Sequence, residues 1–138
     1  MRVLAVDLGA ARIGVAIGEL EFKIASPKPA LAASGTLQRD AEAIVQLAKS
    51  EAAQCIVVGL PLGASGDETR MSRVCRQLGE KIEAMGLRVA YVNEAMTSVE
   101  AEQVLRESDR TAAARRKVRD GEAACRILDR FFHEIEGS

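Results

Sequence analysis

The chain has 138 residues, of which 19 are basic and 20 acidic, so its formal net charge is −1, and 48% of its residues are hydrophobic. A chain of this length buries roughly two-thirds of the surface of its unfolded state, and it has no linker-like stretch, no apolar segment of membrane-spanning length and no secretory leader, so we expect one domain, residues 1–138, in the cytoplasm. Three cysteines and a single histidine are too few for a disulfide framework, a zinc site or a histidine-dependent triad, which leaves oxygen atoms as candidate metal ligands.

Three short strands are predicted at the amino-terminal end. Residues 2–7 form a nearly continuous apolar run, which is typical of a strand buried on both faces of a sheet. Two further strands, over residues 13–18 and 22–26, follow after short turns. We expect these three strands to form an antiparallel meander.

Helices and strands alternate through the rest of the chain. In order, the pattern predicts a helix over residues 40–53, a strand over 55–59, a helix with an apolar face over 71–85, a strand over 87–92 and two carboxyl-terminal helices. Strands that double back and then connect through helices imply an α/β fold. Its mixed sheet has five strands, three antiparallel and then parallel βα units, with helices on both faces.

Two acidic residues are predicted at the carboxyl ends of strands. Asp7 ends the first strand and Glu94 follows the last one, at the edge where α/β sheets bind their ligands. Burying an ionised carboxylate is costly unless a cation or a hydrogen-bond donor compensates it, which favours a functional role. Taken alone, however, Asp7 is better explained as a cap of the following turn, and Glu94 is compatible with an ordinary loop glutamate.

A third acidic residue, Asp120, is expected at the start of an amphipathic helix over residues 118–135. Asp120 falls on the apolar stripe of this helix, which consists of Ala124, Ile127, Leu128, Phe131 and Ile135. The helix therefore directs this acid toward the core. An acid in a first helical turn also caps free amides, and the pattern does not decide between a cap and a ligand.

Together, Asp7, Glu94 and Asp120 form a set of the kind that metal-bound phosphate chemistry uses. Carboxylate oxygens suit hard cations such as Mg²⁺ and Mn²⁺. Two such ions about 4 Å apart activate an attacking water and stabilise the leaving oxygen of a phosphodiester. The three acids therefore predict a metal-dependent nuclease, with Asp7 as a bridging ligand and the other two as flanking ligands.

A run of basic residues immediately precedes the third acid. It contains no acidic residue and includes Arg115, Arg116, Lys117 and Arg119. Such a run can neutralise the phosphates of a nucleic acid beside the scissile bond, although a solvated loop is the alternative for any charge run. Arg12, in the first turn, is a further candidate phosphate contact. With one tyrosine, three phenylalanines and no tryptophan, we expect recognition of backbone and shape rather than base stacking.

Several motifs resemble those of the YqgF family, also called RuvX, of the RNase H-like superfamily. They are VDLG with RIGVA, IVVGLP, VNEAMTS and KVRD, at residues 6–9 with 12–16, 56–61, 92–98 and 117–120. The resemblance covers essentially the whole chain. It implies an RNase H-like fold, a bacterial cytoplasmic location, and either a nuclease that processes the 5′ end of pre-16S ribosomal RNA or a Holliday-junction-resolvase-like enzyme. By position, Asp7, Glu94 and Asp120 match the family's three acidic positions.

The chain also departs from the family pattern near these acids. Where the family usually reads Asp-Glu-Arg-Leu-Thr-Thr, this chain has an amide at Asn93 and no arginine at Ala95. The inferred ligands are intact, but charge that grips a phosphate is missing, so a noncatalytic RNA-binding ribosome-assembly factor is an alternative. A nucleotide-phosphate-binding module like one lobe of an actin-like ATPase is another. The choice between pre-rRNA and branched DNA, and between a monomer and a homodimer, stays open.

Overall fold

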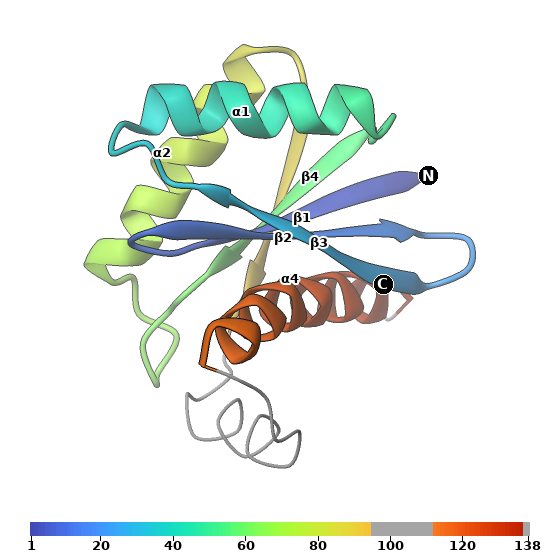
Figure 1. The fold of residues 1–138 in the computed structure, drawn as a ribbon. Coiled ribbons are helices and arrows are strands. Elements are labelled where there is room, and N and C mark those ends of the chain that lie inside the picture. Colours follow the sequence, from blue (N-terminus) through green and yellow to red (C-terminus); the bar gives the residue numbers. More distant parts are fainter. Residues whose placement is uncertain (95–111, 137–138) are drawn as a thin grey trace.

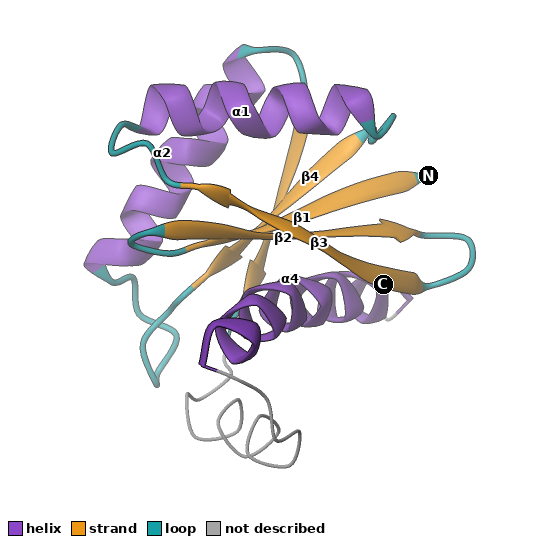
Figure 2. Cartoon of the chain, in the orientation of Figure 1, coloured by secondary structure: helices purple, strands orange, loops and turns teal. Residues whose placement is uncertain are grey.

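The computed structural model describes residues 1–94 and 112–136, with side chains for residues 1–94 and 121–135. The first of the two predicted carboxyl-terminal helices lies outside these residues. The described elements, drawn in Figures 1 and 2, are β1 (Arg2–Leu8), β2 (Arg12–Glu19), β3 (Ile24–Ala32), α1 (Leu37–Ser50), β4 (Cys55–Leu60), α2 (Arg70–Ala84), β5 (Arg88–Asn93) and α4 (Ala112–Glu136).

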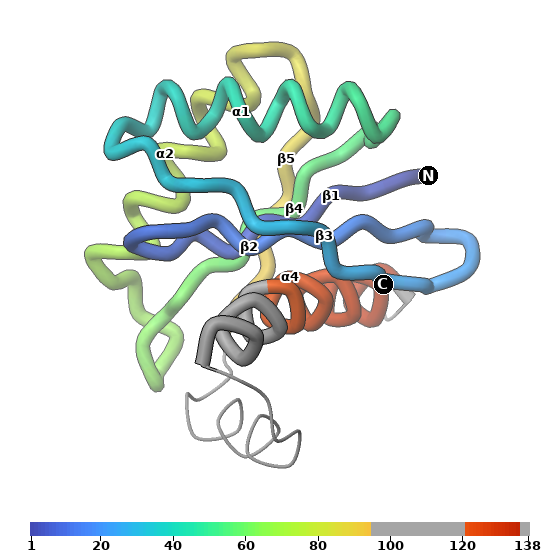
Figure 3. The backbone as a smooth tube through the Cα atoms, viewed as in Figure 1, coloured from blue at the N-terminus to red at the C-terminus, as the bar shows by residue number. Residues whose placement is uncertain are grey.

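The strands form one mixed sheet in the order β3-β2-β1-β4-β5. β2 pairs antiparallel with both β1 and β3, whereas β1, β4 and β5 run parallel. The predicted α/β architecture and the amino-terminal meander are confirmed. Because β1, β4 and β5 are parallel, their carboxyl ends lie at the same edge of the sheet. The turn after β1 and the loop after β4 both leave from that edge (Figure 3).

Helices cover both faces of the sheet, as predicted. α1 and α2 lie on one face and α4 crosses the other (Figures 1 and 2). Alternation along β1 divides its side chains between the two layers: Leu4 and Val6 pack with α1 and α2, whereas Val3 and Ala5 pack with α4. All four side chains are fully buried. No helix among the described residues is long and apolar enough to cross a membrane.

The third strand differs from its prediction. It begins at Ile24 and continues to Ala32, and Phe22, which was placed inside it, lies in the preceding turn with 72% of its surface exposed. The strand contains Pro27 and Pro29, which lack the N–H group of a ladder donor. β3 tolerates them because it is an edge strand of the sheet.

The last helix is longer than predicted. α4 begins at Ala112 rather than near residue 118, so residues 112–119, which include the basic run, are helical, and the alternative of a solvated loop there is wrong. At its other end, Ile135 was expected on the buried stripe but is 39% exposed, and Phe132 is buried instead. A Cβ atom at Gly18 would lie 2.9 Å from Cζ of Phe132, so the ring fills the space that this glycine leaves.

Candidate active site

Asp7 lies near the carboxyl end of β1, beside the first turn. It pairs with Gly14 of β2 and is half-buried. The turn that follows is closed by its own backbone, because the N–H of Gly9 donates to the carbonyl oxygen of Arg12 at 2.9 Å. The side chain of Asp7 forms a hydrogen bond with the carboxyl group of Glu94.

Glu94 is held over the end of β4 by its backbone. Its N–H donates to the carbonyl oxygen of Leu60 at 2.8 Å, which extends the β4–β5 ladder by one residue. Its carboxylate lies above Gly59, since a Cβ atom at that glycine would be 3.2 Å from Oε2 of Glu94. Val6 pairs with Val58, so the next residue along β1, Asp7, lies level with Gly59. The parallel register thus explains why two acids that are distant in sequence meet.

Burial raises the pKa of Glu94 to about 8, and the negative charge of Asp7 and the hydrogen bond between the two side chains add to the effect, while Arg130 acts in the opposite direction. At neutral pH the pair of carboxyl groups therefore retains a proton, which lies in the hydrogen bond between them. Two half-buried carboxyl groups that share one proton form a site at which a cation can replace that proton.

Cys75, on α2, lies within the same negative field. Burial raises the pKa of its thiol to about 12, and the charges of Glu94 and Asp7 act in the same direction. The side chain is almost completely buried, as is usual for a cysteine that serves as a small core residue. A thiol that stays protonated offers no thiolate to a metal, so the oxygen atoms of the two acids are the candidate ligands at this edge.

Arg130 of α4 is a site residue that the sequence did not indicate. Its Nη1 atom donates to the carbonyl oxygen of Asn93, directly before Glu94. Its charge is the one that lowers the pKa of Glu94. Arg130 follows the buried Ile127 by three residues, so both lie on the same face of α4. Because Ile127 packs against Gly59, this face is directed toward the sheet, and the spacing was the signal that could have identified Arg130.

Asp120 lies on α4, and its side chain is outside the described part of the structure. Because α4 begins at Ala112, Asp120 is more than two turns inside the helix, and the alternative of a first-turn cap is wrong. Asp120 precedes Ile127 by seven residues, which places both on one face of α4, about 10 Å apart along its axis. Its approach to the two other acids stays a prediction.

The basic run has a defined backbone but undescribed side chains. Its members Arg115, Arg116, Lys117 and Arg119 lie in the first two turns of α4. Arg12, at the start of β2, is half-buried at the same sheet edge as Asp7. Contact of these five residues with phosphate therefore stays a prediction.

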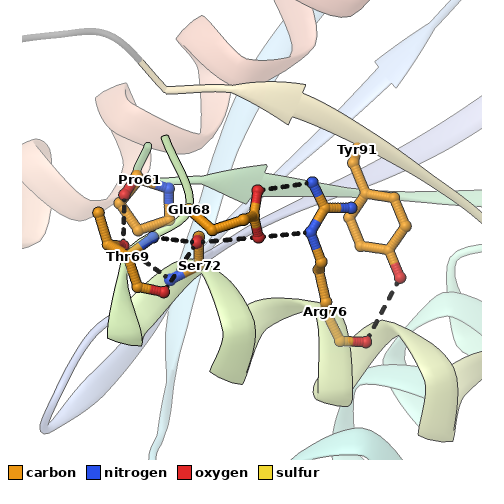
Figure 4. Close-up of polar contacts among 6 residues, drawn as sticks. All are labelled: Pro61, Glu68, Thr69, Ser72, Arg76 and Tyr91. Carbon is orange, nitrogen blue, oxygen red and sulfur yellow. Dashed lines mark hydrogen bonds and ion pairs between the residues drawn. The ribbon is translucent and has the colours of Figure 1, made fainter. Parts of the chain in front are cut away.

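A capping box fixes the start of α2 beside this edge (Figure 4). The hydroxyl of Thr69 accepts from the N–H of Ser72 at 3.0 Å, and the hydroxyl of Ser72 accepts from the N–H of Thr69 at 2.7 Å. Thr69 also donates to the carbonyl oxygen of Pro61 at 2.8 Å. These bonds attach the helix to the loop that leaves β4 next to Gly59.

Three side chains then connect α2 to β5 (Figure 4). The guanidinium of Arg76 donates twice to the carboxylate of Glu68, at 2.7 and 2.9 Å. It lies 5.4 Å from the ring centroid of Tyr91, whose hydroxyl donates to the carbonyl oxygen of Arg76 at 3.4 Å. These contacts therefore hold β5, the strand directly before Glu94, against α2.

The raised pKa of Glu94 predicts an unusual pH dependence of stability. An unfolded glutamate releases its proton near pH 4.5, whereas the folded, metal-free protein retains it up to about pH 8. The folded state thus binds more protons between these values, and its stability should fall as the pH rises, by up to about 1.4 kcal/mol per pH unit. Thermal unfolding in chelator from pH 5 to 9 measures this. Glu94→Gln should have a flatter profile, and identical profiles would contradict the assignment.

Among the described residues, no group of three or more histidine, cysteine, aspartate or glutamate side chains gathers in one place. The two acids at the sheet edge, with Arg130 beside them, are thus the described part of a candidate site whose third acid is expected from α4.

Comparison with known proteins gives consistent results. The family model described as "RuvX: Holliday junction resolvase" matches residues 1–134. A protein of Methylobacillus flagellatus named "Putative pre-16S rRNA nuclease" is 37% identical over 131 residues, which cover 94% of this chain and 89% of that protein. A protein of the same name from Nitrosomonas europaea is 38% identical, with coverages of 94% and 88%. The solved structure of Thermus thermophilus RuvC matches the fold with a TM-score of 0.58 and 12% identity, over 99% of this chain and 97% of that one.

Proposed function

Because the chain belongs to the RuvX family, we propose that it is a nuclease that hydrolyses phosphodiester bonds in the processing of the 5′ end of pre-16S ribosomal RNA. The observation that carries the proposal is the pair of acids at the carboxyl edge of the sheet. Asp7 and Glu94 share a proton in a partly buried site, and an acidic pair of this kind suits catalysis that requires a divalent cation. The single domain spans residues 1–138.

The donor set fits Mg²⁺ or Mn²⁺. Asp7, Glu94 and Asp120 would hold one or two ions through oxygen atoms alone, with Asp7 bridging. When bound, such ions supply an activated water and neutralise the charge on the leaving oxygen. The fit rests on Glu94, whose pKa is raised by burial and, second, by the negative charge of Asp7, so that a cation bound here would favour its ionised form.

The chain's own side chains have separate tasks around that centre. Glu94 must lose its proton to become a ligand, and Arg130, which favours the ionised form, assists this loss. Arg12 and the basic first turns of α4 would bind the phosphates on either side of the scissile bond. The helical geometry of Arg115, Arg116, Lys117 and Arg119 supports this role, since it holds their backbones at fixed spacing along one element.

Branched DNA is the second candidate substrate. It is favoured by the family description and by the solved complex of T. thermophilus RuvC with a Holliday junction substrate, whose fold this chain shares with a TM-score of 0.58. Symmetric cutting of a junction needs two sites related by a twofold axis, and so a homodimer, whereas trimming of an RNA end needs only a monomer. A noncatalytic assembly factor would bind the RNA without cutting it.

Cleavage of matched labelled substrates tests the proposal. A pre-16S ribosomal RNA 5′ segment and a four-way DNA junction are incubated with the protein in Mg²⁺, Mn²⁺ or chelator. We expect metal-dependent cutting of the RNA and little cutting of the junction. Cutting of the junction alone would move the function to resolution, and tight RNA binding without cutting under any metal would replace the nuclease by an assembly factor.

A further inference from the structure

The exposed face of α2 carries two arginines at the end nearest the candidate site. Arg70 and Arg73 are both exposed, and the face continues through Gln77 to Glu80 and Glu83. The helix thus has basic residues in its first turn, where it has no acid, and acidic residues toward its carboxyl end. This order is the reverse of the one that the helix dipole favours, so it costs stability rather than contributing to it.

The backbone at the amino end of α2 is already used in hydrogen bonds within the protein. The capping box of Thr69 and Ser72 already occupies its leading amides. A ligand at this end would therefore be bound by side chains. Arg76 is excluded because its Nε and Nη2 atoms donate to the carboxylate of Glu68, which neutralises its charge. Among the described residues, Arg70 and Arg73 form no ion pair within 4.0 Å, although the pKa of Glu68 is lowered by the hydrogen bonds that Arg76 and Ser72 donate to it and, after them, by the charge of Arg73.

Some cations at the opposite edge of the sheet are paired. Arg2 pairs with Glu19 and Glu51, at 3.5 and 3.0 Å, and Lys28 pairs with Glu51 at 3.5 Å. The amino terminus pairs with Glu21. Lys49 and Arg88 at that edge are exposed and outside these pairs, so what distinguishes Arg70 and Arg73 is their position beside the candidate site.

The position of these arginines relates them to the site. α2 starts directly after the loop that leaves β4 beside Gly59, and Thr69 fastens that loop through Pro61. The start of α2 and the turn after β1 lie on the same side of the molecule (Figure 3). Side chains three residues apart on a helix have Cβ atoms about 5–6 Å apart, so both guanidinium groups can reach one nucleic-acid strand.

We propose that Arg70 and Arg73 form a phosphate-binding surface that holds the nucleic-acid backbone flanking the cleavage position. The inference rests on the proposed function and extends it to a second contact region, opposite the basic turns of α4. A guanidinium binds phosphate with two parallel hydrogen bonds without reading sequence, so this surface contributes affinity and salt dependence rather than base specificity.

The test compares binding of labelled single-stranded pre-rRNA and of a DNA duplex in chelator over a range of KCl concentrations. The Arg70→Ala/Arg73→Ala protein should bind about fivefold more weakly or worse at low salt, and the slope of log K against log salt should flatten by about 1.4 for the single strand and about 1.8 for the duplex. The matched control, Lys49→Ala/Arg88→Ala, removes two exposed cations at the opposite edge and should retain the wild-type slope.

Thermal unfolding separates a binding role from a structural one. Removing two cations from the amino end of a helix should leave the unfolding temperature unchanged or raise it slightly. Arg70→Lys/Arg73→Lys should keep most of the salt slope. Equal slopes for wild type and the alanine variant, or equal losses in the variant and its control, would overturn the proposal. Cleavage by the wild type in metal is read separately, so a protein that binds through this surface without cutting would refute the nuclease alone.

Discussion

Replacing Asp7 by asparagine is expected to abolish metal-dependent cleavage while making the metal-free protein more stable at pH 8. The amide keeps the size of the side chain and its capacity to hydrogen-bond Glu94, but it removes the charge that raises the pKa of Glu94. Changes to groups that merely orient metal ligands already cost about 10–100-fold, so loss of a bridging ligand should lower the cleavage rate by more than about a hundredfold.

The gain in stability is the more discriminating half of this prediction. In wild type, folding at pH 8 places a carboxyl group beside a negative charge, and the protonation that relieves this repulsion becomes harder as the pH rises. Asp7→Asn removes the repulsion, so its unfolding temperature in chelator should exceed that of wild type. A residue that only capped the first turn would have the opposite effect, because its loss would destabilise the fold.

Three measurements on purified protein decide the matter. Isothermal titration of Mn²⁺ should give an affinity at least about tenfold weaker for Asp7→Asn, and Mn²⁺ should raise the unfolding temperature of wild type much more than that of the variant. Asp129→Asn makes the same chemical change at an exposed position of α4 and should behave as wild type. Unchanged Mn²⁺ affinity and stoichiometry in Asp7→Asn would remove Asp7 from the metal site.

The strand ends show which parts of the site could be predicted from sequence. Asp7 and Glu94 each follow an apolar run, and the rule that parallel strands share a carboxyl edge brings them together without any tertiary information. Cys75 could be placed in the core because it falls on the apolar face of the helix that the sequence predicts over residues 71–85. The prediction of a mixed sheet depends only on the spacing of short apolar runs and turns, which are local properties of the chain.

The missed features depend on the way that elements pack. β3 extends through Pro27 and Pro29 because it lies at the edge of the sheet, and position within a sheet cannot be read from a single strand. The early start of α4 and the contact of Arg130 with Asn93 result from the direction in which α4 crosses the sheet. The packing of side chains sets that direction, because large side chains of α4 occupy the space that glycine residues of the sheet leave free.

Gly59 is the clearest of these positions, and it leads to the second large effect. Gly59→Ala should destabilise the protein by about 1–3 kcal/mol, because the new Cβ atom would lie 2.5 Å from Cδ1 of Ile127. Ile127→Val removes that atom and alone should cost about 0.5–1.5 kcal/mol, since Ile127 is buried. Combined with Gly59→Ala, however, Ile127→Val should recover part of the lost stability, because only Cγ1 of this side chain, at 3.0 Å, then remains close to the new Cβ atom, so the sign of its effect should reverse.

Urea denaturation of the four proteins in this double-mutant cycle gives the coupling energy, which should be about 1 kcal/mol or more in favour of the double variant. Gly63→Ala is the matched control, because a Cβ atom there makes only an ordinary contact at 3.6 Å, and its combination with Ile127→Val should be additive. Additivity at Gly59 as well would mean that α4 does not dock where the structure places it.

Activity should not follow stability in this cycle. The Cβ atom at position 59 would also lie 3.2 Å from Oε2 of Glu94, and shortening Ile127 leaves that contact in place. The double variant should therefore be more stable than Gly59→Ala and yet cut no faster, because Glu94 stays displaced from its position beside Asp7. The same glycine then has two roles: it lets Ile127 of α4 pack closely against the sheet, and it leaves room for the carboxylate of Glu94.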